Sequence, residues 1–222
     1  ADGVPVWPII HPKSIGGLSG KHSLVESLRS ISIEDAWLYP NDFREHHVEL
    51  AALSKLRDVV EAFRSSGVRA RMLHGGFFSM ALAFHGLAGF ANGVGYGEWR
   101  DSGYHKGGTA DVRLYCLPLH RFIGAAEADL LISEDPSLFA SDGSLFQQIY
   151  EAGVSFAEVK SATANEHFMY CRDTEISQVA GGTLSDVCEQ LDQAAEAVRA
   201  MGFDEIMVFA ESLERWSEAL SK

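Results

Sequence analysis

Acidic side chains beside glycine-rich turns are the groups in this sequence best suited to general acid–base or nucleophilic chemistry. Glu98 and Asp101 follow the glycine-rich run at residues 92–97, and Asp42 directly follows a short apolar run. A carboxyl pair in two different environments can divide the roles of acid and base or nucleophile. We take Asp42, Glu98 and Asp101 as candidate catalytic residues. The competing interpretations are surface ion pairs with Arg100 and, for Asp42, a helix N-cap.

Two glycine-rich turns supply most of the candidate ligand-binding groups. Residues 69–101 read as strand, helix, strand, and each apolar run ends in glycines that let a ligand approach the backbone. With an aromatic ring from Tyr96 or Phe77, the second turn suits a phosphate nest or a base-stacking slot; a bulge or tight turn that closes a barrel is the alternative. The candidate substrate-binding residues are His74, Gly75, Gly76, Asn92, Gly93, Gly95, Tyr96, Arg100 and His120.

Helices and strands that alternate along the chain are expected to position these groups. Apolar residues recur every three or four positions over residues 45–66, which predicts an amphipathic helix ended by Gly67. Thr183 and Asp186 resemble a capping pair at the start of a second clear helix, to Met201. Residues 165–179 fit either a helix or a strand. Further strands are predicted at 4–10, 35–39, 68–73, 88–91, 112–117, 154–159 and 205–210, and further helices at 120–132 and 145–152.

This pattern predicts a mixed α/β fold in one domain over residues 1–222. Several of the predicted strands are apolar on both faces, which is typical of a parallel sheet covered by helices. We favour a TIM-barrel-like (β/α) fold, complete or degenerate, with C-terminal helices. It is preferred to a doubly wound sheet because no GxGxxG follows the first strand.

Parallel strands bring their carboxyl ends to one edge, and ligands bind there in both architectures. The rule selects His11, Asp42 with Asn41, the turn at 74–76, residues 92–101 and His120. These side chains are therefore expected to meet at one mouth.

Composition excludes several classes of function. Eighteen basic against thirty-one acidic residues give a formal charge of −13, which argues against duplex nucleic-acid binding. No apolar run is long enough for a membrane span, and the first residues lack the basic region of a signal peptide. The three cysteines, Cys116, Cys171 and Cys188, are widely spaced and fit a reducing compartment. We expect a cytoplasmic protein.

Motifs for cofactors and metals are missing from the sequence. There is no P-loop, no GxSxG elbow, no HExxH and no CxxC unit, so neither a cofactor nor a metal is predicted. A metal site assembled from distant residues is an alternative hypothesis, with His11, Asp42, His74 and His120 as ligands.

The order LHGG, short helix, GFANGVGYGE and VRLYCLPL resembles the distal half of the tRNA-guanine transglycosylase barrel. The resemblance implies that the backbone at 92–95 grips a base, with Gly75, Gly76 and Glu98 nearby. The segment NEHFMY is similar to that family's HNLxFY run. The family's clustered zinc cysteines are absent here, and its catalytic aspartate has no counterpart that we can place.

These observations lead to three hypotheses. The first is that the chain binds a purine-like base, nucleoside or nucleotide at the mouth of a barrel, with base-exchange or glycosidic-bond chemistry by carboxylates. The second is an inert barrel that binds a protein partner or a second copy of itself. The third is a metal-dependent hydrolase with distributed histidine and aspartate ligands. Whether the chain is an enzyme stays open at this point.

Overall fold

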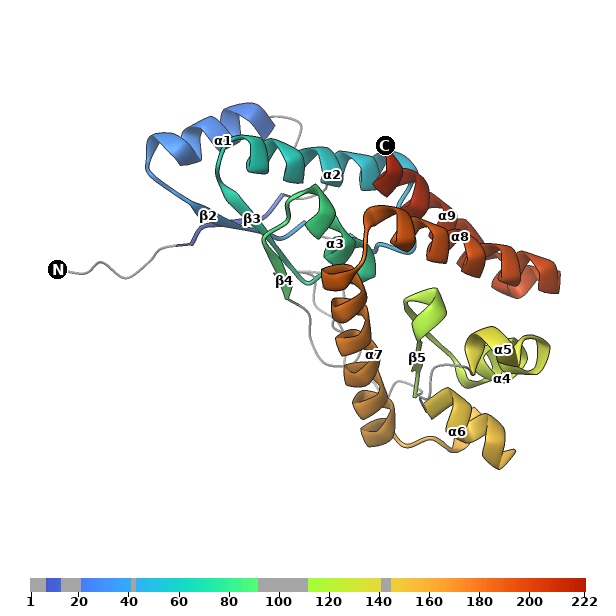
Figure 1. The fold of residues 1–222 in the computed structure, drawn as a ribbon. Helices are drawn as coiled ribbons and strands as arrows, with labels where there is room; N and C mark the ends of the chain where they lie inside the picture. Colours follow the sequence, from blue (N-terminus) through green and yellow to red (C-terminus); the bar gives the residue numbers. More distant parts are fainter. Residues whose placement is uncertain (1–6, 13–20, 41–42, 92–111, 141–144) are drawn as a thin grey trace. The chain divides into compact units, whose positions relative to one another are not determined.

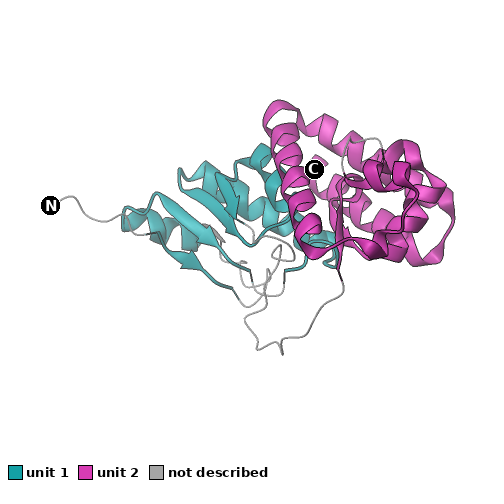
Figure 2. Ribbon diagram, turned by 90° about the horizontal axis from the view of Figure 1, so that it is seen from below, with its two compact units in different colours: residues 1–93, 97–104, 222 teal, residues 94–96, 105–221 magenta. Residues whose placement is uncertain are grey.

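A computed structural model describes residues 7–12, 21–40, 43–91, 112–140 and 145–222. The chain divides into two compact units, which Figure 2 shows in two colours. The first unit takes in residues 1–93, and the second takes in nearly all residues from 105 onward. We describe each unit by itself.

The first unit contains a four-stranded parallel sheet in the order β1-β2-β3-β4 (Figure 1). Its register places Ile10 beside Leu38, and Leu38 beside Met72. This confirms the parallel sheet that the apolar runs predicted. The strands are β1 (Ile9–Ile10), β2 (Asp35–Leu38), β3 (Arg69–Leu73) and β4 (Gly89–Ala91).

Helices α1 (Lys21–Ser30) and α2 (Leu50–Ser65) contact each other along this sheet (Figure 1). The predicted helix is present as α2, which buries its apolar stripe and ends before Gly67, a residue in the left-handed region at φ 77°. It begins five residues later than the pattern indicates, because residues 45–47 form a turn. After β3 come α3 (Phe77–Ala81) and a 3₁₀ turn, η2 (Leu82–His85).

Asp35 is a buried carboxylate at the amino end of β2 that pairs with two partly exposed arginines. Its carboxylate accepts hydrogen bonds from Arg69 Nη2 at 2.5 Å and from Arg71 Nε at 3.2 Å. The register makes this possible, since Asp35 lies opposite Arg69 and β3 then places Arg71 on the same face. Burial by itself raises the pKa of Asp35, but the hydrogen bonds and charges of the two arginines outweigh it and hold the pKa below its usual value.

We expect Asp35→Asn to lower the free energy of unfolding by about 1–3 kcal/mol at neutral pH. Because the folded pKa is lowered, the carboxylate stabilises the protein above the unfolded pKa of about 3.9 and loses this effect as the pH falls through the folded pKa. Urea denaturation followed by far-UV circular dichroism should show a wild-type advantage that is constant above about pH 5 and shrinks below about pH 4. An advantage that grew on acidification would contradict the assignment.

The second unit is mostly helical and contains a separate two-stranded antiparallel sheet of β5 (Leu114–Cys116) and β6 (Arg121–Ile123). A 3₁₀ turn, η3 (Leu117–Leu119), joins the two strands. The remaining elements are α4 (Ala125–Glu134), α5 (Pro136–Phe139), α6 (Leu145–Ala152), η4 (Phe156–Glu158), α7 (Ser161–Gly181), α8 (Leu184–Met201) and α9 (Asp204–Ser221).

Three predictions for this unit are wrong. The helix predicted from residue 120 starts with β6, and only from Ala125 is it helical, as α4. The strand predicted at 154–159 is the 3₁₀ turn η4, where Ser155 Oγ caps the backbone N–H of Ala157. The strand predicted at 205–210 lies inside α9, because its apolar residues continue at helical spacing through Leu213 and Trp216.

Helix α8 shows the predicted capping box. Thr183 Oγ1 accepts from the backbone N–H of Asp186, and Asp186 Oδ2 accepts from the backbone N–H of Thr183 at 2.8 Å. Hydrogen bonds from the Thr183 side chain and backbone lower the pKa of Asp186. Helices α8 and α9 pack against each other, and Arg199 pairs with Glu214 across them.

A closed eight-stranded barrel is not formed by the described residues, whose strands belong to the four-stranded and two-stranded sheets above. The coarser prediction, a mixed α/β fold with a parallel sheet and C-terminal helices, is confirmed. Among the described helices, none has the length and apolar character needed to cross a membrane.

Candidate functional site

Three aromatic side chains form a row at the carboxyl edge of the parallel sheet. His11 follows β1, Tyr39 follows β2 and His74 follows β3. The ring centroids of His11 and Tyr39 are 4.7 Å apart, and those of Tyr39 and His74 are 5.6 Å apart. His11 is exposed, whereas Tyr39 and His74 are half-buried. We call these three residues the aromatic row.

The parallel register explains the row. Ile10, Leu38 and Met72 are neighbours across the ladder, so His11 and Tyr39, one residue further on, and His74, two residues further on, all lie at the same edge of the sheet. The edge rule therefore correctly brought His11 and His74 together. Tyr39 was not predicted, because the sequence places it inside the strand 35–39, whereas β2 ends at Leu38.

His74 turns the chain sharply into the two glycines. It has φ 60°, in the left-handed region that non-glycine residues seldom occupy and that often marks a functional or strongly constrained position. The N–H of Gly75 donates to the carbonyl of Ala91 at 3.2 Å, which ties the turn to β4. A β-carbon on Gly75 would overlap the side chain of Ser79, so this position requires glycine.

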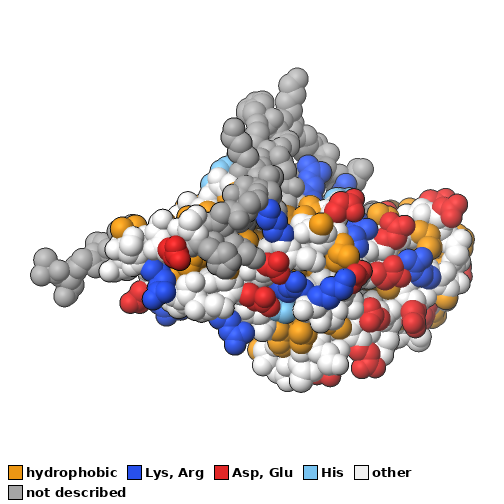
Figure 3. Space-filling model, turned by 90° about the horizontal axis from the view of Figure 1, so that it is seen from above, with side chains coloured by type: hydrophobic (Ala, Val, Ile, Leu, Met, Phe, Trp, Pro, Cys, Tyr) orange, Lys and Arg blue, Asp and Glu red, His pale blue; other side chains and the backbone are white. Residues whose placement is uncertain are grey.

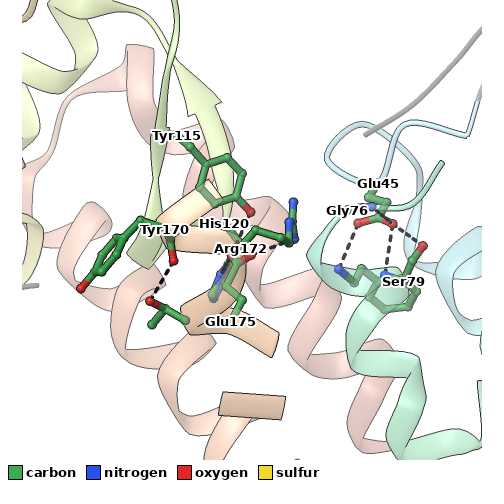
Figure 4. A network of polar contacts seen from close by, with 10 residues as sticks. Glu45, Gly76, Ser79, Tyr115, His120, Tyr170, Arg172 and Glu175 are labelled. Carbon is green, nitrogen blue, oxygen red and sulfur yellow. Dashed lines mark hydrogen bonds and ion pairs between the residues drawn. The ribbon is translucent and has the colours of Figure 1, made fainter. Parts of the chain in front are cut away.

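Glu45 is a buried carboxylate at this edge of the sheet. Its side chain contacts the turn between β3 and α3, as Figure 4 shows. It accepts from the backbone N–H groups of Gly76 at 2.9 Å, Phe78 at 3.0 Å and Ser79 at 3.1 Å, and also from the Ser79 hydroxyl. The residue is 5% exposed. Glu45 thus supplies the acceptors for the first turn of α3, whose backbone donors have no partner within the helix.

The edge combines accessible rings with a rigid support. The π faces of Tyr39, His11 and His74 can stack on a planar ligand, while the imidazole nitrogens and the phenol can donate or accept hydrogen bonds at its rim. The hydrogen bonds of Glu45 hold the start of α3, which begins three residues after His74. This arrangement suits binding of a flat heteroaromatic molecule.

The other sequence-predicted site residues fall into two groups. His74, Gly75 and Gly76 lie at the carboxyl edge as predicted. His120 belongs to the second unit, where β5 pairs antiparallel with β6, so the edge rule for parallel strands does not apply to it. Outside the described residues lie Asp42, Asn92, Gly93, Gly95, Tyr96, Glu98, Arg100 and Asp101.

A buried polar cluster in the second unit surrounds Glu175 of α7 (Figure 4). Glu175 Oε1 accepts from the Tyr115 hydroxyl at 2.8 Å and lies 2.6 Å from His120 Nδ1, and Oε2 lies 2.7 Å from Arg172 Nη1. All four residues are buried, and Glu175 is 0% exposed. The Arg172 guanidinium also lies over the rings of Tyr115 and Phe168, at 5.2 Å from each centroid. We call Tyr115, His120, Arg172 and Glu175 the Glu175 cluster.

His167 extends the polar contacts of α7. Its Nε2 lies 2.7 Å from the carbonyl oxygen of Tyr115, so this nitrogen carries the proton that is donated. The Cys171 thiol lies 3.4 Å from the same ring nitrogen. Because Cys171 is fully buried, we assign this contact to packing of α7 against β5.

The Glu175 cluster joins β5 and the end of the η3 turn, where His120 lies, to helix α7.

The sequence contains a signal for this cluster. Residues 164, 168, 171, 175 and 179 follow the spacing of a buried helical stripe, and the buried members are Ala164, Phe168, Cys171, Glu175 and Val179. A carboxylate inside an apolar stripe indicates a buried charge that needs a partner. The sequence alone does not reveal this stripe, because residues 165–179 fit either a helix or a strand.

No protein-family model, curated protein or solved structure matches this chain. Groups of three or more His, Cys, Asp or Glu able to hold a metal ion are also absent from the described part of the chain.

In the view of Figure 3, Asp and Glu side chains are frequent at the end where the C-terminal helices lie, with Lys and Arg between them.

Proposed function

We propose that the first unit binds a purine-like base, nucleoside or nucleotide on the aromatic row. The observation that carries the proposal is the row itself, three rings within stacking distance at the carboxyl edge of a parallel sheet. The resemblance of LHGG and GFANGVGYGE to the base-binding half of a transglycosylase barrel supports the same ligand class. Base exchange or cleavage of a glycosidic bond, with carboxylate catalysis by Asp42, Glu98 or Asp101, is the proposed reaction.

Stacking favours a base over an aliphatic ligand. Aromatic pairs prefer offset or tilted arrangements with centroids about 4.5–7 Å apart, and the row already has this spacing. A purine laid on Tyr39 would extend the same pattern. Its ring nitrogens and exocyclic groups would face the imidazoles of His11 and His74, which can act as donors or acceptors.

Ligand binding to Tyr39 variants tests this proposal. Stacking contributes about 1–3 kcal/mol per base, so Tyr39→Leu should weaken the affinity for guanine or adenine about 5- to 150-fold by isothermal titration calorimetry. Tyr39→Phe retains the π face and should bind nearly as well. The matched control is Tyr150→Leu, an exposed tyrosine of α6 in the second unit, which should leave the affinity unchanged. Equal binding by wild type and Tyr39→Leu would refute the proposed site.

A further inference from the structure

The parallel sheet of the first unit has one covered face and one accessible face. Side chains alternate between the two faces along each strand. The covered face carries residues that are 0–1% exposed, namely Ala36, Leu38, Ala70 and Met72. The alternate residues of the same strands lie on the other face, which we call the open face. Its described members are Trp7, Ile9, Asp35, Trp37, Arg69, Arg71 and Leu73.

The open face is an unusual surface for a parallel sheet. Such sheets occur almost only where both faces are covered, so that their apolar side chains are buried on either side. Here Ile9 is 60% exposed and Trp7 is 48% exposed, while Trp37 and Leu73 are half-buried. Large apolar side chains that stay accessible together mark a binding surface.

Two tryptophans on the open face continue the aromatic row along the sheet. The ring centroids of Trp7 and Trp37 are 6.4 Å apart. The backbone N–H of Tyr39 donates to the carbonyl of Ile10 at 2.8 Å, so the chain is still paired with β1 there. Trp37 and Tyr39 are two residues apart and therefore lie on one face, about 7 Å from each other along the chain.

We infer that the open face is a second base-binding subsite, and that the ligand of the first unit is a pair of nucleosides joined through phosphate. One base would lie on the aromatic row and the other against Trp7 and Trp37. This rests on the proposed function and extends its ligand. A spacing of about 7 Å is longer than the ~3.4 Å between stacked bases, so the two bases would be splayed apart, each on its own aromatic surface.

Arg71 is the cation placed for the linking phosphate. It lies opposite Trp37 in the register, is 27% exposed, and holds its guanidinium 5.5 Å from the Trp7 centroid. Its Nε and Nη2 face the Asp35 carboxylate, and a guanidinium carries two more N–H donors on Nη1. The exposed acid Glu34 lies near Arg69, at 4.0 Å. Arg71 thus offers a local positive group in a chain whose formal charge of −13 otherwise opposes phosphate.

Calorimetry on the full chain with adenosine and adenylyl-3′,5′-adenosine tests the second subsite. The dinucleotide should bind about 5- to 150-fold more tightly than adenosine, which is the gain from stacking one more base. Diadenosine diphosphate, measured in parallel, joins the nucleosides through a 5′,5′ pyrophosphate, and the tighter of the two dinucleotides identifies the linkage. Equal affinities for adenosine and both dinucleotides would overturn the second subsite and leave the proposed function standing. Failure of all three to bind would overturn both.

Trp7→Leu separates the two subsites. It removes an accessible ring outside the aromatic row, so the dinucleotide should lose at least about fivefold in affinity while adenosine binds as before. Tyr150→Leu is the matched control, because Tyr150 is also 48% exposed but belongs to the second unit, and it should change neither affinity. A dinucleotide that bound folded Trp7→Leu as tightly as wild type would overturn the second subsite.

A second copy of the chain is the competing occupant of the open face. Two open faces in contact would form a symmetric dimer, which a charge at its centre would dissociate. Sedimentation velocity of wild type and Trp7→Arg, at the concentrations used for calorimetry, distinguishes the two occupants. A monomeric wild type supports the ligand site. A wild-type dimer that Trp7→Arg converts to a monomer would overturn it.

Discussion

Replacing Arg172 by methionine is expected to lower the free energy of unfolding by about 3–5 kcal/mol. Arg172 is the cation that faces Glu175, and both side chains are buried, at 5% and 0% accessible. Methionine fills a similar volume but removes the guanidinium, so the buried carboxylate loses its ion pair with Arg172 in a medium of low polarity. The measurement is urea denaturation followed by far-UV circular dichroism at neutral pH.

The double variant Arg172→Met/Glu175→Gln is the control for charge. The glutamine oxygen can still accept from Tyr115 and His120, and no uncompensated charge stays buried. The double variant should therefore be more stable than Arg172→Met alone, since removing both charges is less costly than removing one. A double variant less stable than either single variant would show that the ion pair is not the source of the effect.

Glu45→Leu is expected to destabilise the first unit by at least about 3 kcal/mol. The substitution leaves three backbone N–H groups and one hydroxyl without their buried acceptor, and each such loss costs about 1–3 kcal/mol. Urea denaturation gives the size of the effect. Hydrogen exchange gives its place, because the amides of Gly76, Phe78 and Ser79 should lose protection first.

Glu49→Leu is the matched control for Glu45→Leu. Glu49 precedes α2, is exposed and makes no side-chain cap hydrogen bond, so its replacement should change stability by no more than about 0.5 kcal/mol. Equal effects of the two substitutions would contradict the role assigned to the Glu45 carboxylate.

Local sequence patterns were sufficient to predict the helices whose apolar residues recur at helical spacing and whose ends carry capping residues. Helix α2 and the capping box of α8 could be predicted because apolar spacing and cap residues are local properties. The short apolar run in α9 could not, since the five apolar residues 206–210 fit a buried strand as well as a helix. Its state depends on residues beyond it, Leu213 and Trp216, that continue the helical stripe.

Pairing between strands was harder to predict than the strands themselves. Residues 114–116 form a strand as expected, but its partner is β6, which follows after one short turn. A strand's own sequence does not specify whether its neighbour is parallel or antiparallel, because that depends on what the next segment does. The prediction that His120 lies at the carboxyl edge of a parallel sheet assumed that the strand before it has a parallel partner.

The candidate site was predicted where topology alone determines it. Parallel strands put His11 and His74 at one edge whatever the loops do, whereas the role of Glu45 depends on a turn that folds its side chain back onto α3. Glu45 is the first residue of the helix predicted at 45–66, so the sequence pattern assigned it to that helix and gave no indication of its contact with α3. Buried carboxylates that cap a distant helix leave no local signal.

The most direct test of base binding at the aromatic row is nuclear magnetic resonance of the full chain with guanine or guanosine. The account predicts intermolecular nuclear Overhauser effects between the purine H8 proton and the ring protons of Tyr39 and His74, with no change at Tyr150. Effects confined to the second unit, or binding without any contact to these two rings, would contradict it.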